Sequence, residues 1–184
     1  MSRKHPSIVV IVIAALGLLT FWVVRSKRAA LVGREQQQTF PHRRIGPEWA
    51  YPDSNRTPGA TNPAISQANL QETICGPEWT TKSVRPPASY TSRLKREQMR
   101  DWGLPGTTAD YEEDHLISLE LGGHPTDPRN LWPEAYEPSP GAREKDVVEN
   151  YLHRQVCSGA ITLDAAQNAI ATDWYKVYLE IEKR

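Results

Sequence analysis

The C-terminal part of the chain carries its most regular hydrophobic pattern. After Thr162, a good helix cap, apolar residues recur at spacings of three and four. They predict one buried helix face made of Leu163, Ala166, Ile170, Trp174, Val177 and Ile181. Before it, Ser139 and Pro140 suit the cap and first position of another helix, which runs to about residue 156 or 157 and stops at Gly159.

The middle of the chain predicts a hairpin between flanking helices. Thr91 caps a helix over about Ser92–Trp102, and Gly103 occupies the position that ends it. Residues 111–123 have an alternating centre and finish on a Gly-Gly turn, and residues 130–133 give a return strand stopped by proline. Short apolar runs in 68–84 indicate a further strand or two. The order hairpin, helix, helix is typical of an α+β fold.

The N-terminal segment predicts a membrane anchor. Residues 7–24 carry no charge, and eighteen residues rising 1.5 Å each span about 27 Å, enough to cross a bilayer core. A cleavable signal peptide is the alternative, but this run is longer than usual and ends in Arg25-Ser26-Lys27-Arg28, a poor cleavage context. Bases after the span place the rest of the chain in the cytoplasm by the positive-inside rule.

Three parts of the chain follow from these patterns. Residues 1–28 form the anchor with its basic flanks, and residues 67–184 form one small folded domain. Residues 29–66 contain three consecutive glutamines and five prolines and show no period of 2 or 3.6. Such a segment buries too little apolar surface to offset its chain entropy, so we expect a disordered tether.

Charge and cysteine content exclude several classes of protein. The chain has 22 Lys+Arg and 22 Asp+Glu, but every charged residue before Ala29 is basic, so the remainder is acidic. Bulk electrostatic capture of nucleic acid is therefore excluded as the main source of affinity, and nucleic-acid chemistry requires a local patch or a metal. Two cysteines exclude a four-thiolate zinc site and a multi-disulfide framework.

Asp114 and His115 are adjacent at the end of the first predicted strand. Metal-dependent phosphodiester hydrolysis needs a ligand for a hard cation beside a base that takes a proton from water, and these two residues supply both. An amide such as Asn130 can hold the histidine-bearing loop through backbone groups. The following helix presents Asp146, Glu149 and His153 at spacings of three and four, on one side.

These motifs resemble the ββα-metal hairpin of HNH-type endonucleases. The match consists of Glu113-Asp114-His115-Leu116, Leu121-Gly122-Gly123 and Asn130-Leu131-Trp132-Pro133. Similarity to one small, often exported branch extends over about residues 67–177. The resemblance implies that Asp114 is a metal ligand, His115 the general base, and Asn130 the residue that fixes the hairpin.

The helix ligand of that family, usually His or Asn, has no unambiguous match here. We favour Glu149 and His153, with Glu144 and Asp146 as alternatives. Oxygen ligands favour Mg²⁺ or Mn²⁺, whereas a histidine ligand shifts the preference toward Zn²⁺.

The predicted helix at 92–102 carries the basic surface of an acidic domain. Arg93, Lys95 and Arg96 are candidates for holding a phosphate backbone, and a salt-bridged, solvated face is the alternative. Cys75 and Cys157 are either two buried thiols or a disulfide. Because the resembling branch tends to be exported, we favour a disulfide and a domain outside the cytoplasmic membrane, against the positive-inside rule.

The sequence thus predicts a membrane-anchored, metal-dependent nuclease that acts on DNA or RNA. The alternative is a non-catalytic envelope protein that keeps a degenerate nuclease-like fold as a binding or scaffolding module.

Overall fold

The computed structural model of the chain describes residues 44–184. The predicted anchor and the first part of the predicted tether lie outside the described residues. Within 44–184, no helix has the length and apolar character needed to cross a membrane.

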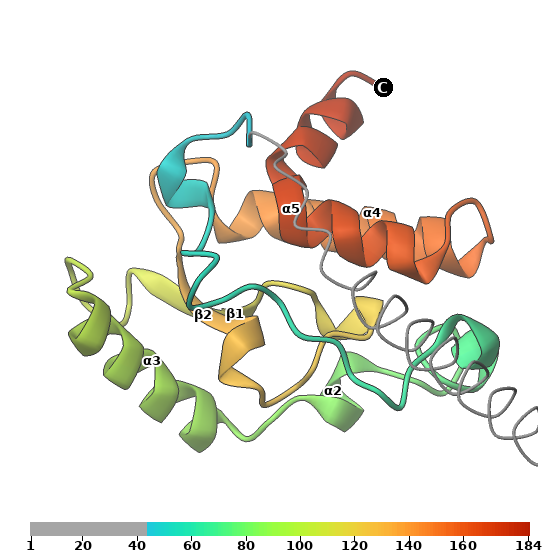
Figure 1. Cartoon of the computed structure of the whole chain (residues 1–184), viewed down its shortest axis with the longest axis horizontal. Coiled ribbons are helices and arrows are strands. Elements are labelled where there is room, and N and C mark those ends of the chain that lie inside the picture. Colours follow the sequence, from blue (N-terminus) through green and yellow to red (C-terminus); the bar gives the residue numbers. More distant parts are fainter. Residues whose placement is uncertain (1–43) are drawn as a thin grey trace, which may run out of the picture. The chain divides into compact units, whose positions relative to one another are not determined.

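The described residues form an α+β fold in which a two-stranded antiparallel hairpin is followed by two helices (Figure 1). The α-helices and strands are α2 (Thr81–Val84), α3 (Ala88–Trp102), β1 (Tyr111–His115), β2 (Leu131–Ala135), α4 (Ala142–Cys157) and α5 (Leu163–Glu182). Short 3-10 helices lie at Glu48–Ala50, Gln67–Glu72, Leu119–Leu121 and Pro128–Asn130. The predicted α+β class and the predicted order of a hairpin followed by two helices are confirmed.

The hairpin lies between α3 and α4, which are on opposite sides of it in Figure 1. Asp114 pairs with Trp132 and His115 with Leu131. Residues directly opposite each other share a face of a sheet, and successive residues alternate between faces. Asp114 and Glu134 therefore face α4, whose Lys145 side chain lies against both.

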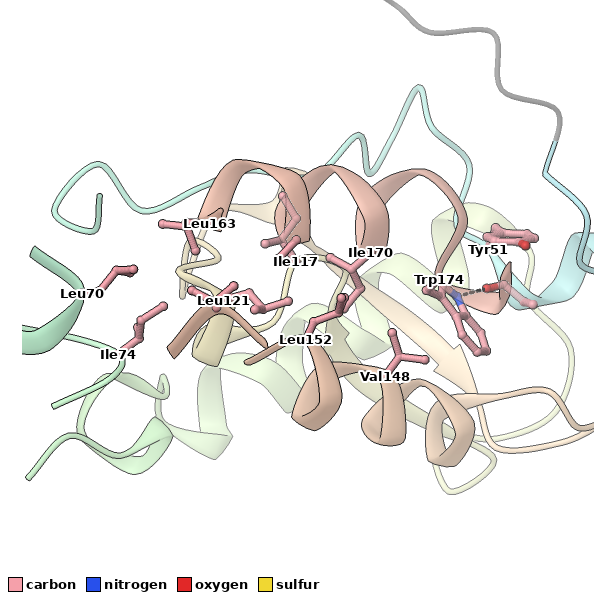
Figure 2. Packing of buried hydrophobic residues seen from close by; sticks show 13 residues of the cluster. Tyr51, Leu70, Ile74, Ile117, Leu121, Val148, Leu152, Leu163, Ile170 and Trp174 are labelled. Atoms are coloured by element: carbon pink, nitrogen blue, oxygen red, sulfur yellow. Dashed lines mark hydrogen bonds between the residues drawn. The ribbon is translucent and has the colours of Figure 1, made fainter. Parts of the chain in front are cut away.

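The main core lies where α4 and α5 pack together (Figure 2). Val148 and Leu152 of α4 meet Ile170 and Trp174 of α5, and all four are almost fully buried. The core extends to the loop after β1 and to the segment before α2 through Ile117, Leu121, Leu70 and Ile74. Cys75 and Cys157 form a disulfide, with Cα atoms 5.4 Å apart, which links that segment to the end of α4.

The tether prediction is wrong for residues 44–66. Ala50, Tyr51 and Thr57 are buried, and the indole nitrogen of Trp174 donates a 2.7 Å hydrogen bond to the Ala50 carbonyl. Asp173 interrupts the helical backbone of α5 and accepts hydrogen bonds from the Tyr51 hydroxyl and the Ile45 amide. Hydrogen bonds and single aromatic contacts fix this segment, and neither produces a periodic sequence pattern.

Two predicted helix starts are displaced. Helix α3 begins at Ala88, and Thr91 lies inside it, with its hydroxyl donating to the Ala88 carbonyl. Helix α4 begins after Gly141, because the Glu144 carboxylate accepts the Gly141 amide hydrogen and so caps the first turn there. The predicted ends of both helices and the Thr162 cap of α5 are confirmed.

The strands also differ from the prediction, and the return strand continues past Pro133 to Ala135 instead of stopping at the proline. Residues 68–84 contain a 3-10 helix and the single turn of α2 in place of strands. Strand β1 ends at His115, and the apolar residues that follow turn into the core. Pro133 lies inside β2, which tolerates its missing N–H because each strand of a two-stranded sheet is an edge strand.

Candidate functional site

Asn130 holds the loop that follows β1. Its amide nitrogen donates to the carbonyls of Ile117 (3.0 Å) and His124 (3.2 Å), and its amide oxygen accepts from the Ile117 amide (2.9 Å). The side chain is fully buried. Gly123 passes so close that a Cβ there would lie 1.7 Å from the Ile117 carbonyl oxygen, which only glycine avoids. The predicted hydrogen bonding of Asn130 to hairpin backbone groups is therefore present.

This loop fixes the ring of His115. Its Nε2 lies 2.9 Å from the Pro125 carbonyl oxygen, and a carbonyl only accepts hydrogen bonds, so Nε2 carries the hydrogen. In a neutral ring, Nδ1 is then the basic nitrogen. Burial lowers the pKa of His115, which favours this neutral form. His115 therefore has the protonation state that a general base requires.

Asp114 and Glu149 converge on Lys145, which the sequence did not single out. The Lys145 ammonium donates to Oδ2 of Asp114 (2.5 Å), Oε1 of Glu149 (2.5 Å) and the His115 carbonyl (2.9 Å). Its side chain is 0% exposed, whereas those of Asp114 and Glu149 are 16% and 14% exposed. The ammonium therefore lies behind the two carboxylates, which retain access to solvent.

The protonation of this cluster follows from burial and from Lys145. Burial raises the pKa of Asp114, but the Lys145 ammonium, together with Glu134 and His115, outweighs it and holds that pKa below its usual range. Burial also raises the pKa of Glu149 to about 8 and that of Glu134 well above its ordinary value, against the attraction of Lys145. Asp114 is thus the most acidic of the three groups.

A pocket of about 220 Å³ opens in front of these groups. It is lined by the carboxylates of Asp114, Glu120, Asp146 and Glu149, together with His115, Ser118 and Arg85. The Ser118 hydroxyl and one oxygen of Glu120 are buried and have no hydrogen-bond partner among the described residues. Buried polar atoms without a partner are uncommon and point to a ligand or ordered water.

The carboxylates of this pocket are the type of ligand that a hard divalent cation takes. Lys145 bonds one oxygen each of Asp114 and Glu149, and the second oxygen of each is not used by the ammonium. Mg²⁺ typically takes one or two protein carboxylates and keeps several waters or substrate phosphates. Two carboxylates beside a neutral histidine match that pattern better than the closed tetrahedral sites of zinc.

His153 lies outside this pocket. Its Nε2 is 2.8 Å from the Ile74 carbonyl oxygen, and its Nδ1 is 3.7 Å from a carboxylate oxygen of Glu120. One of its nitrogens and the sulfurs of Cys75 and Cys157 lie within 4.8 Å of one another, but the disulfide already uses both sulfurs. Of the two favoured helix ligands, the structure brings only Glu149 to Asp114.

The predicted basic surface of α3 also lies apart from the pocket lining. Lys95 donates to the carbonyls of Thr108 and Tyr111, both at 2.7 Å, and so ties the loop before β1 to α3. Arg93 pairs at 4.0 Å with Glu97, and Arg96 is exposed. The arginine that lines the pocket is Arg85, at the end of α2.

Lys145, Arg85 and Glu134 were missed by sequence reasoning. Lys145 stands between Glu144 and Asp146, which is typical of an exposed charge run. The available signal was its spacing of four from Glu149 on the helix face that carries the candidate ligands.

Comparison of the chain with protein-family models, with characterised proteins and with solved structures finds no match. The resemblance to HNH-type endonucleases therefore stays a prediction.

Proposed function

We propose that the chain hydrolyses phosphodiester bonds of nucleic acid in the pocket beside β1, as an HNH-like nuclease that depends on Mg²⁺ or Mn²⁺. The observation that carries this proposal is the His115 ring, whose Nε2 is bound to the Pro125 carbonyl while His115 lines the same pocket as Asp114. A buried histidine with one fixed nitrogen and one basic nitrogen, next to a carboxylate, suits proton abstraction from water.

Each group then has a role set by its chemistry. Nδ1 of His115 takes the proton of the attacking water, and Asn130 keeps the His115 loop in place. Asp114 and Glu149 hold the divalent cation, which when bound polarises the scissile phosphate and stabilises the leaving oxygen. Arg85 offers its guanidinium to a phosphate oxygen at the rim of the pocket.

The acidity of the pocket supports a requirement for metal. Four carboxylates line it, and Arg85 is its basic lining residue. A phosphate entering this space finds little positive charge to bind, since Lys145 is already bonded to Asp114 and Glu149. A divalent cation supplies that positive charge, and substrate binding is expected to weaken strongly with salt.

The disulfide supports a location outside the cytoplasm. Disulfides persist in oxidising compartments and are reduced in the cytosol of most cells. We therefore propose that residues 7–24 anchor the chain and that the described domain lies beyond the cytoplasmic membrane.

A non-catalytic binding or scaffolding role is the second candidate, and Lys145 is the observation that favours it. Its ammonium gives Asp114 and Glu149 a cationic partner without any metal. Such a protein keeps a stable fold and shows no cleavage.

Cleavage of supercoiled plasmid and of RNA by the full chain in detergent separates the two candidates. We expect cleavage with Mg²⁺ or Mn²⁺ and none with EDTA. Replacing the base with His115→Ala is expected to lower the cleavage rate by a factor of about 10²–10⁴. His153→Ala is the matched control, because that histidine lies outside the pocket, and its rate stays within about threefold of wild type. Equal inertness of folded wild type and His115→Ala in every metal contradicts the nuclease proposal.

A further inference from the structure

Lys145 is a fully buried cation whose hydrogens all have acceptors. Its three N–H groups point to two carboxylates and one backbone carbonyl. Burying an ammonium is unfavourable unless such partners are present, and removing one partner of a buried pair is strongly destabilising. The arrangement is therefore specific, because each acceptor must lie where the ammonium needs it.

The three acceptors come from two elements. Asp114 and the His115 carbonyl belong to the end of β1, whereas Glu149 lies one turn after Lys145 on α4. Lys145 therefore connects the strand that carries one candidate metal ligand to the helix that carries the other. It also fixes which oxygen of each carboxylate is used, Oδ2 of Asp114 and Oε1 of Glu149.

We propose that Lys145 is the positioning residue of the cation site: from behind the pocket it holds Asp114 and Glu149 so that their second oxygens bind one divalent cation. This inference rests on the proposed function, in that it assumes a cation at these two carboxylates. It differs from the scaffolding alternative, in which the ammonium replaces the metal. In the positioning role, ammonium and metal are bound together, one on each side of the carboxylates.

Binding of Mn²⁺ to the full chain, measured by the loss of the free Mn²⁺ electron paramagnetic resonance signal, tests this role without relying on activity. Lys145→Ala and Lys145→Met are each expected to weaken Mn²⁺ binding at least tenfold. Lys183→Met, near the exposed C-terminus, is the matched control and binds as wild type.

Chemical rescue separates positioning from a general loss of structure. Lys145→Ala lacks the three methylenes and ammonium of the lysine, so propylammonium fits the vacated space and restores Mn²⁺ binding. Tetramethylammonium has no N–H donor and does not restore it. Lys145→Met fills the space with an apolar chain and is not rescued by either ion. Unchanged Mn²⁺ affinity in folded Lys145→Met overturns the inference.

The wild-type chain provides a test that does not depend on whether the variants fold. A buried ammonium exchanges its hydrogens slowly, so the Nζ signal of Lys145 is observable by proton–nitrogen NMR. We expect this signal to persist when diamagnetic Mg²⁺ saturates the site. Its loss on Mg²⁺ binding means that metal displaces the ammonium, which also overturns the inference. No Mn²⁺ or Mg²⁺ binding by wild type instead contradicts the metal-dependent function itself.

Discussion

The two sides of the β1–β2 hairpin use their charged residues in different ways. On the α4 side, one buried lysine lies among Asp114, Glu134 and Glu149, and a pocket opens in front of it. On the α3 side, the basic residues are largely at the surface or already bonded, as Lys95 is to two backbone carbonyls. The α4 side, which has fewer basic residues, is therefore the better candidate for a catalytic site. Its charges are buried, so each one strongly shifts the pKa values of its neighbours.

The largest expected effect concerns the covalent link on the α4 side. Removing the disulfide with the double change Cys75→Ser and Cys157→Ser is expected to lower the free energy of unfolding by about 2–5 kcal/mol, because the link spans 82 positions. Urea unfolding of wild type and variant, each with and without reductant, measures the difference. A reductant effect on the double variant, or none on wild type, contradicts this assignment.

Loss of the Asn130 side chain is expected to have an effect of similar size. Asn130→Ala leaves the Ile117 and His124 backbone groups without partners in a buried site, which costs about 1–3 kcal/mol for each unsatisfied group. Asn168→Ala, whose amide bonds only the exposed Asp164, is the matched control and stays within about 0.5 kcal/mol of wild type. Thermal unfolding compares them, and equal losses in both variants remove the special role of Asn130.

A smaller expected effect is the pH dependence of stability that Glu113 causes on the α3 side. Burial, with the negative charge of Asp114, raises the pKa of Glu113 to about 8, and neither of its carboxylate oxygens has a hydrogen-bond partner within residues 44–184. Between pH 4.5 and 8 the folded chain keeps this proton while the unfolded chain releases it, so the contribution of Glu113 to stability falls as pH rises.

Glu113→Gln removes this contribution. We expect the free energy of unfolding of the variant, relative to that of wild type, to rise by at least about 1.4 kcal/mol from pH 5 to pH 8. This amount is the equivalent of one pKa unit. Unfolding curves at the two pH values measure it. A constant difference between the proteins shows that Glu113 does not titrate in this range.

The smallest expected effect is on the surface of α3. Arg93→Ala combined with Arg96→Ala is expected to change stability by less than about 0.5 kcal/mol and nucleic-acid affinity by less than about twofold. Arg85→Ala, in the pocket, weakens affinity about tenfold, since a charge-assisted hydrogen bond contributes about 1.5–3 kcal/mol. Fluorescence anisotropy with a labelled oligonucleotide compares them. A larger loss in the α3 variant places the substrate on that side.

Local signals predicted much of this fold. The Gly-Gly turn, the return strand and the Thr162 cap each depend on a few neighbouring residues, and all three are present. The hydrogen bonds of Asn130 were predictable because a buried amide needs both donors and acceptors, which a tight loop supplies.

Long-range contacts explain what the sequence did not predict. Residues 44–66 are fixed by partners on α5 more than a hundred positions away. Glu149 and His153 share a helix face, but four residues rise about 6 Å along the axis, and that step takes His153 to Ile74. Lys145 was missed because a charge run looks the same whether it is solvated or covered by a hairpin.

The most direct test of the central claim is an anomalous difference map from a crystal of the chain grown with Mn²⁺. We predict one strong peak in the pocket, within about 2.0–2.6 Å of a carboxylate oxygen of Asp114 and one of Glu149, with Lys145 still bonded to their other oxygens. A peak at His153, or none at saturating Mn²⁺, contradicts the assignment of this pocket as the metal centre of a nuclease.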